Sequence, residues 1–171
     1  GNIGECGCAP TSMAAIVSTV GNTTIDPEKM AEFFYQNDGQ RGGGRCGSNW
    51  IWESKAQLFK DKFGVTIKAV QPSAENASRG LSEGGLVLIS VGGKTPFIRG
   101  GHIMFIRGKT ADGKFLVGDP NKRSNTENKA GFAASKFHFG EKADKGKNEE
   151  DDGTTGMWVI TGPKKVGGRS S

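Results

Sequence analysis

The chain has 171 residues, enough for one compact domain, and 34% of them are hydrophobic and 24% charged. No apolar run approaches the roughly 18 residues that cross a bilayer, so we expect no integral membrane segment. The net charge of +5 permits an anionic partner. However, the lysines are interleaved with acids and no aromatic residues alternate with basic ones, so we expect no nucleic-acid binding. The 28 glycines, well above the usual share of about 7%, predict many turns and loops.

Helices are predicted in the first third of the chain. A helix from residue 11 is indicated by apolar residues at helical spacing, namely Met13, Ile16, Val17 and Val20. Pro10 suits its first turn, and Gly21 stops it. A second helix is predicted from the N-cap Asp26 to about residues 37–39, and a third over 48–63.

The rest of the chain changes period. Strands are predicted by alternating or continuous apolar runs at 65–70, 86–91, 102–107, 114–118 and 157–161, with a short helix over 73–82. The pair Asp112-Gly113 between two of these runs indicates a hairpin. Because helices come first and mostly antiparallel strands follow, the predicted fold class is α+β, with N-terminal helices packed on the sheet.

We expect one domain over residues 1–162. Within it, residues 141–155 are charged and nearly devoid of apolar side chains, which predicts a mobile loop, and residues 163–171 are expected to form a flexible tail. The chain begins at Gly1 without methionine or signal peptide, so we expect a mature fragment or an excised domain.

The three cysteines are Cys6, Cys8 and Cys46, and an odd number leaves at least one thiol unpaired within the chain. A zinc site is disfavoured, because Cys6 and Cys8 are separated by one residue and not by the two to four of common sites. We therefore expect no metal and no other cofactor. Cys8 comes just before the first helix, where unpaired N–H groups and the helix dipole favour a nucleophilic thiolate. The alternative is an inert buried cysteine.

A cysteine nucleophile needs a base and a group that orients that base. His102 starts an apolar strand, and the hairpin register predicts it opposite Asn121, with Asp119 as a diagonal neighbour. Both Asp119 and Asn121 have oxygens that can accept from an imidazole N–H. His138 lies in Phe137-His138-Phe139, which is typical of a half-buried strand, and has no partner at a sensible spacing.

Three blocks of sequence together resemble a known family. They are Gly7-Cys8-Ala9-Pro10-Thr11-Ser12, Gly100-Gly101-His102 and Gly118-Asp119-Pro120-Asn121. In this order they are similar to the papain-like cysteine peptidases of the bacteriocin-processing class, and more closely to free-standing bacterial domains that resemble peptidase family thirty-nine. The resemblance implies a papain-like fold and a Cys8–His102–Asp119 triad.

The resemblance is incomplete around the nucleophile. Ala9 replaces the family's glycine, and Asn2 stands where papain-like enzymes usually carry an oxyanion-hole glutamine. The Asn2 amide is a candidate oxyanion donor together with the backbone N–H of Cys8. A disulfide between Cys6 and Cys46 would leave Cys8 free in an oxidising compartment, whereas the alternative is two simple thiols.

The implied function is a cysteine peptidase that hydrolyses peptide or protein substrates through an acyl-thioester. Two alternatives stay open: a catalytically idle peptide-binding module, and an amidase or transglutaminase-like acyltransferase on the same scaffold. The resemblance also implies a bacterial protein that is secreted or associated with the cell envelope. The sequence indicates neither the cleavage specificity nor the oligomeric state.

Overall fold

The computed structural model describes residues 8–38, 52–144 and 149–167, and these form an α+β fold. Helices come first in the chain: α2 (Cys8–Val20), α3 (Pro27–Asp38) and α4 (Trp52–Phe63). Strands dominate the remainder: β1 (Thr66–Val70), β2 (Leu86–Val91), β3 (His102–Lys109), β4 (Phe115–Gly118) and β5 (Thr154–Thr161). The shorter helices are α5 (Ala74–Ser82), α6 (Arg123–Thr126) and two 3-10 turns, Ala134–Phe137 and Glu149–Asp151.

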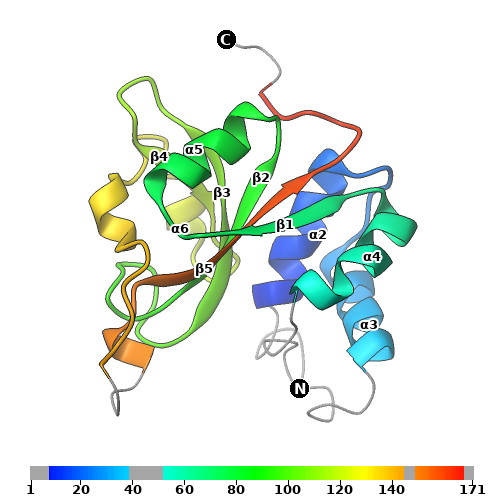
Figure 1. The fold of residues 1–171 in the computed structure, drawn as a ribbon, viewed down its shortest axis with the longest axis horizontal. Helices are drawn as coiled ribbons and strands as arrows, with labels where there is room; N and C mark the ends of the chain where they lie inside the picture. Colours follow the sequence, from blue (N-terminus) through cyan, green and yellow to red (C-terminus); the bar gives the residue numbers. More distant parts are fainter. Residues whose placement is uncertain (1–7, 39–51, 145–148, 168–171) are drawn as a thin grey trace.

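The strands form one five-stranded sheet in the order β1-β5-β2-β3-β4, and every neighbouring pair is antiparallel. Helices α2, α3 and α4 lie together beside one face of this sheet, whereas α5 and α6 lie on the other side of the molecule (Figure 1). Two clusters of buried apolar residues correspond to these layers. One joins α2 to the sheet through Met13, Ile16 and Leu88, and the other joins α5 to it through Ala77 and Val87. The predicted α+β architecture is confirmed.

Local capping explains where the helices begin and end. The Asp26 carboxylate accepts a hydrogen bond from the backbone N–H of Lys29 at 2.8 Å, which starts α3 as predicted. Ser73 caps α5 in the same way, accepting from the N–H of Asn76 at 3.0 Å. Gly64 follows α4 with a φ of +75°, a conformation that disfavours other residues.

The β3–β4 hairpin has the predicted register near the site, although a bulge intervenes. Phe105 pairs with Gly118 and Ile106 with Val117, but Gly108 pairs with Leu116, so Arg107 is an extra residue on β3. Continued three residues along β3, this register places His102 opposite Asn121.

Regular structure or backbone hydrogen bonds occur in the described parts of the two segments that the sequence predicts as a loop and a tail. Residues 141–155 include a 3-10 turn, and β5 already begins at Thr154. In the expected tail, Lys164 donates its backbone N–H to Val20 and Val166 donates to Gly84, at 3.0 and 2.8 Å. The chain after residue 162 therefore crosses the end of α2 and the loop before β2.

The expected strand around His138 is wrong. Phe137 ends a 3-10 helix, and His138 has a φ of +46°, which is incompatible with an extended strand. His138 also has a partner, because its Nδ1 lies 3.1 Å from a carboxylate oxygen of Glu141. The apolar neighbours Phe137 and Phe139 suggested a strand by alternation, but the turn is fixed by backbone hydrogen bonds from Glu141 and Thr154 to the His138 carbonyl.

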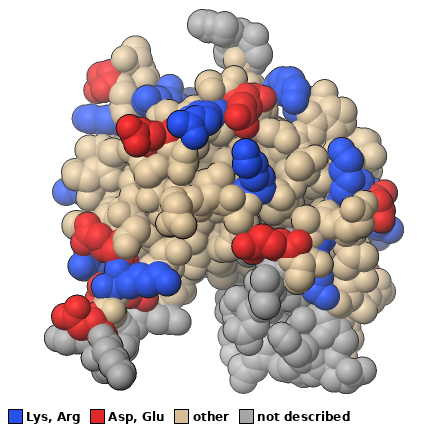
Figure 2. Space-filling view, in the orientation of Figure 1, with Lys and Arg blue, Asp and Glu red and all other residues tan. Residues whose placement is uncertain are grey.

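On the face drawn in Figure 2, acidic and basic side chains are interspersed. This agrees with the interleaving in the sequence. In the described ranges no helix is long and apolar enough to cross a membrane.

The contact between Phe105 and Gly118 gives a test of how tightly β3 and β4 pack. A Cβ at position 118 would overlap the phenyl ring of Phe105. We expect Gly118→Ala to lower the free energy of unfolding by about 1–3 kcal/mol, the usual cost of overpacking, as measured by urea denaturation. Gly108→Ala is the matched control, because its Cβ would meet Leu116 only at an ordinary 3.4 Å. Equal stabilities of the two variants would contradict this packing.

Candidate active site

Cys8 is the first residue of α2, and its side chain is half-buried. Pro10 fits the first turn of the helix because its missing N–H would have no intrahelical acceptor there. The thiol lies at the positive dipole end of α2, where the backbone of Ala9 also forms a hydrogen bond with it, and both effects favour its ionised form.

Hydrogen bonds to Ile103 join the start of α2 to the start of β3. The fully buried hydroxyl of Ser12 donates to the Ile103 carbonyl at 3.3 Å. The backbone of Ile103 also forms a hydrogen bond with the Cys8 thiol. Because the backbone of Ile103 contacts two residues of α2, the thiol is held beside the preceding residue of β3, which is His102.

His102 and Asp119 form a buried pair. The imidazole Nε2 lies 2.8 Å from Oδ1 of Asp119, and the two side chains are 1% and 0% exposed. Burial acts to raise the pKa of Asp119, but hydrogen bonds from His102, Asn125 and Asn121 outweigh it and hold the pKa below its usual value. An ionised Asp119 requires that Nε2 carries a proton and donates it. The remaining nitrogen, Nδ1, is therefore the one left to face Cys8, with the Asn121 amide also 3.4 Å from it.

Cys8 and His102 shift each other's pKa. Burial acts to lower the pKa of His102, but its hydrogen bonds to Asp119 and Cys8 prevail and raise it to about 9. Burial likewise acts to raise the pKa of Cys8, whereas the hydrogen bond to His102 and the backbone bond to Ile103 prevail and lower it. A raised imidazole pKa and a lowered thiol pKa together favour a thiolate–imidazolium pair at neutral pH.

The structure thus brings Cys8, His102 and Asp119 together, as the sequence predicted. Of the two predicted acceptors for His102, Asp119 accepts from Nε2, whereas Asn121 presents its amide nitrogen, a donor, at 3.4 Å from Nδ1. Cys8 is a free thiol. Asn2, Cys6 and Cys46 lie outside the described residues, so the oxyanion role of Asn2 and the Cys6–Cys46 disulfide stay predictions. Within the described ranges, no three His, Cys, Asp or Glu side chains gather where they could hold a metal ion.

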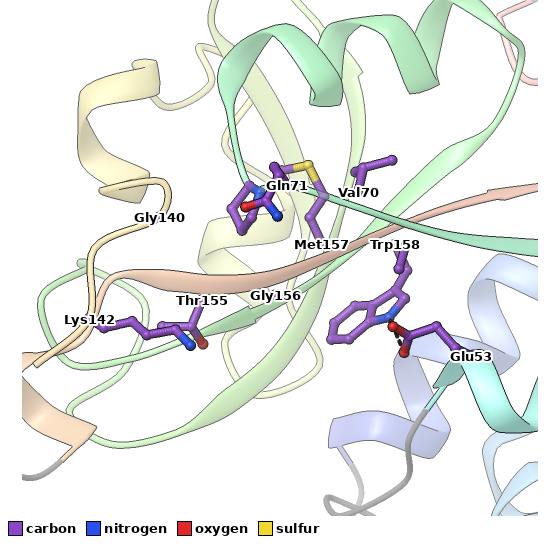
Figure 3. A pocket seen from close by; sticks show the side chains of 11 residues that line it. Glu53, Val70, Gln71, Gly140, Lys142, Thr155, Gly156, Met157 and Trp158 are labelled. Carbon is purple, nitrogen blue, oxygen red and sulfur yellow. Dashed lines mark hydrogen bonds between the residues drawn. The ribbon is translucent and has the colours of Figure 1, made fainter.

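A groove of about 500 Å³ lies where β5, the end of β1 and the start of α4 meet. Figure 3 shows the indole of Trp158 and the carboxylate of Glu53 at one end of it and Lys142 at the other. The indole Nε1 donates to Glu53 at 3.4 Å. The floor beneath the indole is Gly156, where a Cβ would lie 2.6 Å from the ring. A side chain at position 156 would therefore displace Trp158.

The groove lies near the start of β3 in the sheet. Gly156 pairs with Ser90, and Ser90 pairs with Ile103, whose backbone contacts Cys8. Two strand spacings amount to about 10 Å, the length of about three extended residues. Trp158 and Cys8 also pack against the same apolar cluster, so both lie on the face that α2 covers.

Two kinds of site residue were not found by sequence reasoning. Asn125 and Thr126 lie in a four-residue helix, too short to show any periodicity, within a polar stretch that reads as a loop. Glu53 belongs to an ordinary amphipathic helix, and only the fold brings it to Trp158. No local pattern of residues marks either kind, because both depend on contacts between distant segments.

A thiol at a helix N-terminus, hydrogen bonded to a histidine on an antiparallel sheet, is an arrangement consistent with a papain-like peptidase fold. The family model described as "Peptidase_C39 like family" matches residues 3–144, and the chain belongs to this family. No curated protein matches the chain at a significant level.

The pKa shifts predict the reactivity of Cys8. Iodoacetamide should label Cys8 with an apparent pKa below the ordinary thiol value of about 8.5, because His102 stabilises the thiolate. His102→Ala should raise that apparent pKa and slow labelling at pH 6. Labelling rates against pH, read by mass spectrometry of the reduced protein, measure both effects. An ordinary thiol pKa in the wild type, unchanged by His102→Ala, would contradict the pairing.

Proposed function

We propose that the protein is a cysteine peptidase whose catalytic residues are Cys8, His102 and Asp119. The family assignment supports a peptidase-like function. The observation that carries the catalytic proposal is the almost fully buried pair of Asp119 and His102, joined at 2.8 Å, together with the interaction of that histidine with Cys8 that lowers the pKa of the thiol. Nucleophile, base and orienting acid are the three groups that acyl transfer by a cysteine requires.

In the proposed reaction, the Cys8 thiolate attacks the carbonyl carbon of the scissile peptide and a carbon–sulfur bond forms. The negative charge moves to the carbonyl oxygen, where the backbone N–H of Cys8 is a candidate donor, with Asn2 as the predicted second donor. When the intermediate collapses, the carbon–nitrogen bond breaks and Nδ1 of His102 gives its proton to the departing amine.

The acyl-thioester is then hydrolysed. His102 takes a proton from water through Nδ1, and the hydroxide attacks the thioester carbonyl and releases the acid. The carbon–sulfur bond breaks to restore the thiolate beside a protonated imidazole. Asp119 stays ionised throughout, and its bond to Nε2 keeps the ring in the orientation that both steps need.

The groove at Gly156 and Trp158 is the proposed binding site for the substrate chain on one side of the scissile bond. Its floor, Gly156, lies two strand spacings, about 10 Å, from Ile103, whose backbone contacts Cys8. The groove has an aromatic wall, a carboxylate and an ammonium group. A polypeptide with both apolar and charged side chains suits such a lining better than a small molecule does.

Two other functions use the same scaffold. An idle binding module would gain nothing from an ionised thiol, so the lowered pKa of Cys8 argues against it. An acyltransferase shares the thioester step and differs only in the acceptor, which is an amine and not water. The products of the reaction distinguish this alternative.

Replacement of the nucleophile tests the peptidase proposal. We expect the wild type to cleave members of a mixture of peptides from a digested proteome, read as new termini by mass spectrometry. Cys8→Ala should reduce the rate of cleavage at least about a thousandfold, while its circular dichroism spectrum stays unchanged. Cleavage should decline as the pH rises through about 9, because His102 then loses the proton that the leaving amine needs.

The same reaction with added glycine amide separates hydrolysis from acyl transfer. We expect free carboxyl termini with and without the amine. Products that carry the amine in preference to water would assign an acyltransferase. Retained cleavage by Cys8→Ala would exclude Cys8 as the nucleophile.

Filling the groove floor tests substrate binding. Gly156→Ala pushes its Cβ to within 2.6 Å of the Trp158 ring, so the indole must move. We expect KM for a cleaved peptide to rise about tenfold, equivalent to ~1.4 kcal/mol, with little change in kcat. The pH dependence of Cys8 labelling should be unchanged. Gly108→Ala, on β3 and separated from β5 by β2, is the control and should leave KM unaltered. An unaltered KM in Gly156→Ala as well would remove the groove from the substrate path.

A further inference from the structure

The proposed triad uses only one oxygen of the Asp119 carboxylate. Oδ1 accepts from Nε2 of His102 at 2.8 Å and from the backbone N–H of Asn121 at 3.0 Å. Oδ2 points to α6, where the side-chain amide of Asn125 donates to it at 2.8 Å. Since this carboxylate is 0% exposed, its charge is stabilised by these donors and not by solvent, and a buried charge without partners is costly.

The Asn125 amide is itself held in place by its neighbours. Thr126, the next residue of α6, accepts the backbone N–H of Asp119 through its hydroxyl at 2.8 Å. The Arg107 side chain donates from one nitrogen to the carbonyl of Thr126 and from another to the carbonyl of Val117, each at 3.0 Å. The guanidinium thus joins α6 to the last residues of β4. The short helix cannot move away from Asp119 without breaking these bonds.

The chemistry of an amide suits this position. The Asn125 nitrogen can only donate, so its bond to Oδ2 is strongest when Asp119 is ionised. Donors on both oxygens also fix the plane of the carboxylate. Because Oδ1 accepts from Nε2, the orientation of the carboxylate plane determines how the imidazole is turned about its Cβ–Cγ bond. The rotation of the ring in turn determines where Nδ1 points relative to the Cys8 thiol.

We propose that Asn125 is a positioning residue of the site: it keeps the Asp119 carboxylate ionised and oriented, so that His102 stays aligned with Cys8. It acts through Asp119. Its effect on hydrolysis rests on the proposed function, but its effect on the thiol does not require any substrate.

The test is the pH dependence of Cys8 labelling by iodoacetamide in Asn125→Ala and in Asn125→Asp. In Asn125→Ala, loss of the donor destabilises the ionised form of Asp119, which in turn stabilises the His102 imidazolium less. The apparent pKa of Cys8 should therefore rise by roughly 0.5–1 unit. Asn125→Asp keeps the shape of the side chain but places a second carboxylate against Oδ2, so the rise should exceed about one unit.

Asn128→Asp is the matched control. Asn128 uses its side-chain oxygen to accept the backbone N–H groups of Ala130 and Gly131, and a carboxylate can do the same. This variant adds the same charge three residues away, and it should leave the pKa of Cys8 unchanged. A shift as large as that of Asn125→Asp would show a general effect of charge and overturn the proposal.

The remaining outcomes are also decisive. If Cys8 labels as an ordinary thiol in the wild type, the proposed catalytic pair fails. If the wild type has a lowered pKa and Asn125→Ala has the same one, only the role of Asn125 fails.

Urea denaturation at a series of pH values tests the proposal even if the variants fold poorly, because it measures their free energy of unfolding. The stability deficit of Asn125→Asp should shrink as the pH falls from 7 to 4, because a protonated carboxyl can again donate to Asp119. A deficit that does not depend on pH would overturn the proposal.

Discussion

The geometry of the site depends on how α2 meets β3 at Ile103. One strand residue receives the Ser12 hydroxyl on its carbonyl and bonds through its backbone with the Cys8 thiol. Helix and strand come from segments about ninety residues apart, and the apolar cluster that joins α2 to the sheet brings them together without fixing their register. Because these polar contacts have strict geometric requirements, they set the position of the thiol against His102 where apolar packing alone would permit sliding.

The charges of the site stabilise one another against burial. Desolvation acts against the ionised form of each of the three groups, and in each case hydrogen bonds to the others reverse the direction of the pKa shift. The charged state is therefore a property of the whole set. Polar neighbours on α6 extend the set beyond the three side chains, and Asp119 is the residue through which they act.

Much of this architecture could be predicted from the sequence. The apolar run at 86–91 is a strand with the predicted bounds, and the predicted cap Asp26 lies at the start of α3. The short helix predicted over 73–82 is α5, which Ser73 caps. The nearness of Asp119 to His102 followed from the hairpin, because pairing in a two-stranded ribbon is set by its turn. These features follow from helix caps, from the spacing of apolar residues and from the hairpin turn, all of which can be recognised in the sequence.

Other features were beyond that reasoning. His138 reads as part of a strand because its neighbours alternate, yet tertiary hydrogen bonds to its carbonyl impose a left-handed conformation. The groove depends on Glu53 and Trp158 meeting across more than a hundred residues. Asn125 is one of many polar residues in a loop-like stretch, and only the buried oxygen of Asp119 distinguishes it.

The bulge at Arg107 separates the tip of the β3–β4 hairpin from the site. The tip, residues 111–113, is exposed, and the pairing nearest to it is offset by one residue from the pairing beside Asp119. Arg107 fastens the inner part of the hairpin to β4 and α6 by its own side chain, independently of the turn. The tip is consequently a permissive place for inserted sequence: an epitope or a fluorescent label added there would extend the ribbon outward and leave the strand pairing beside the site in register.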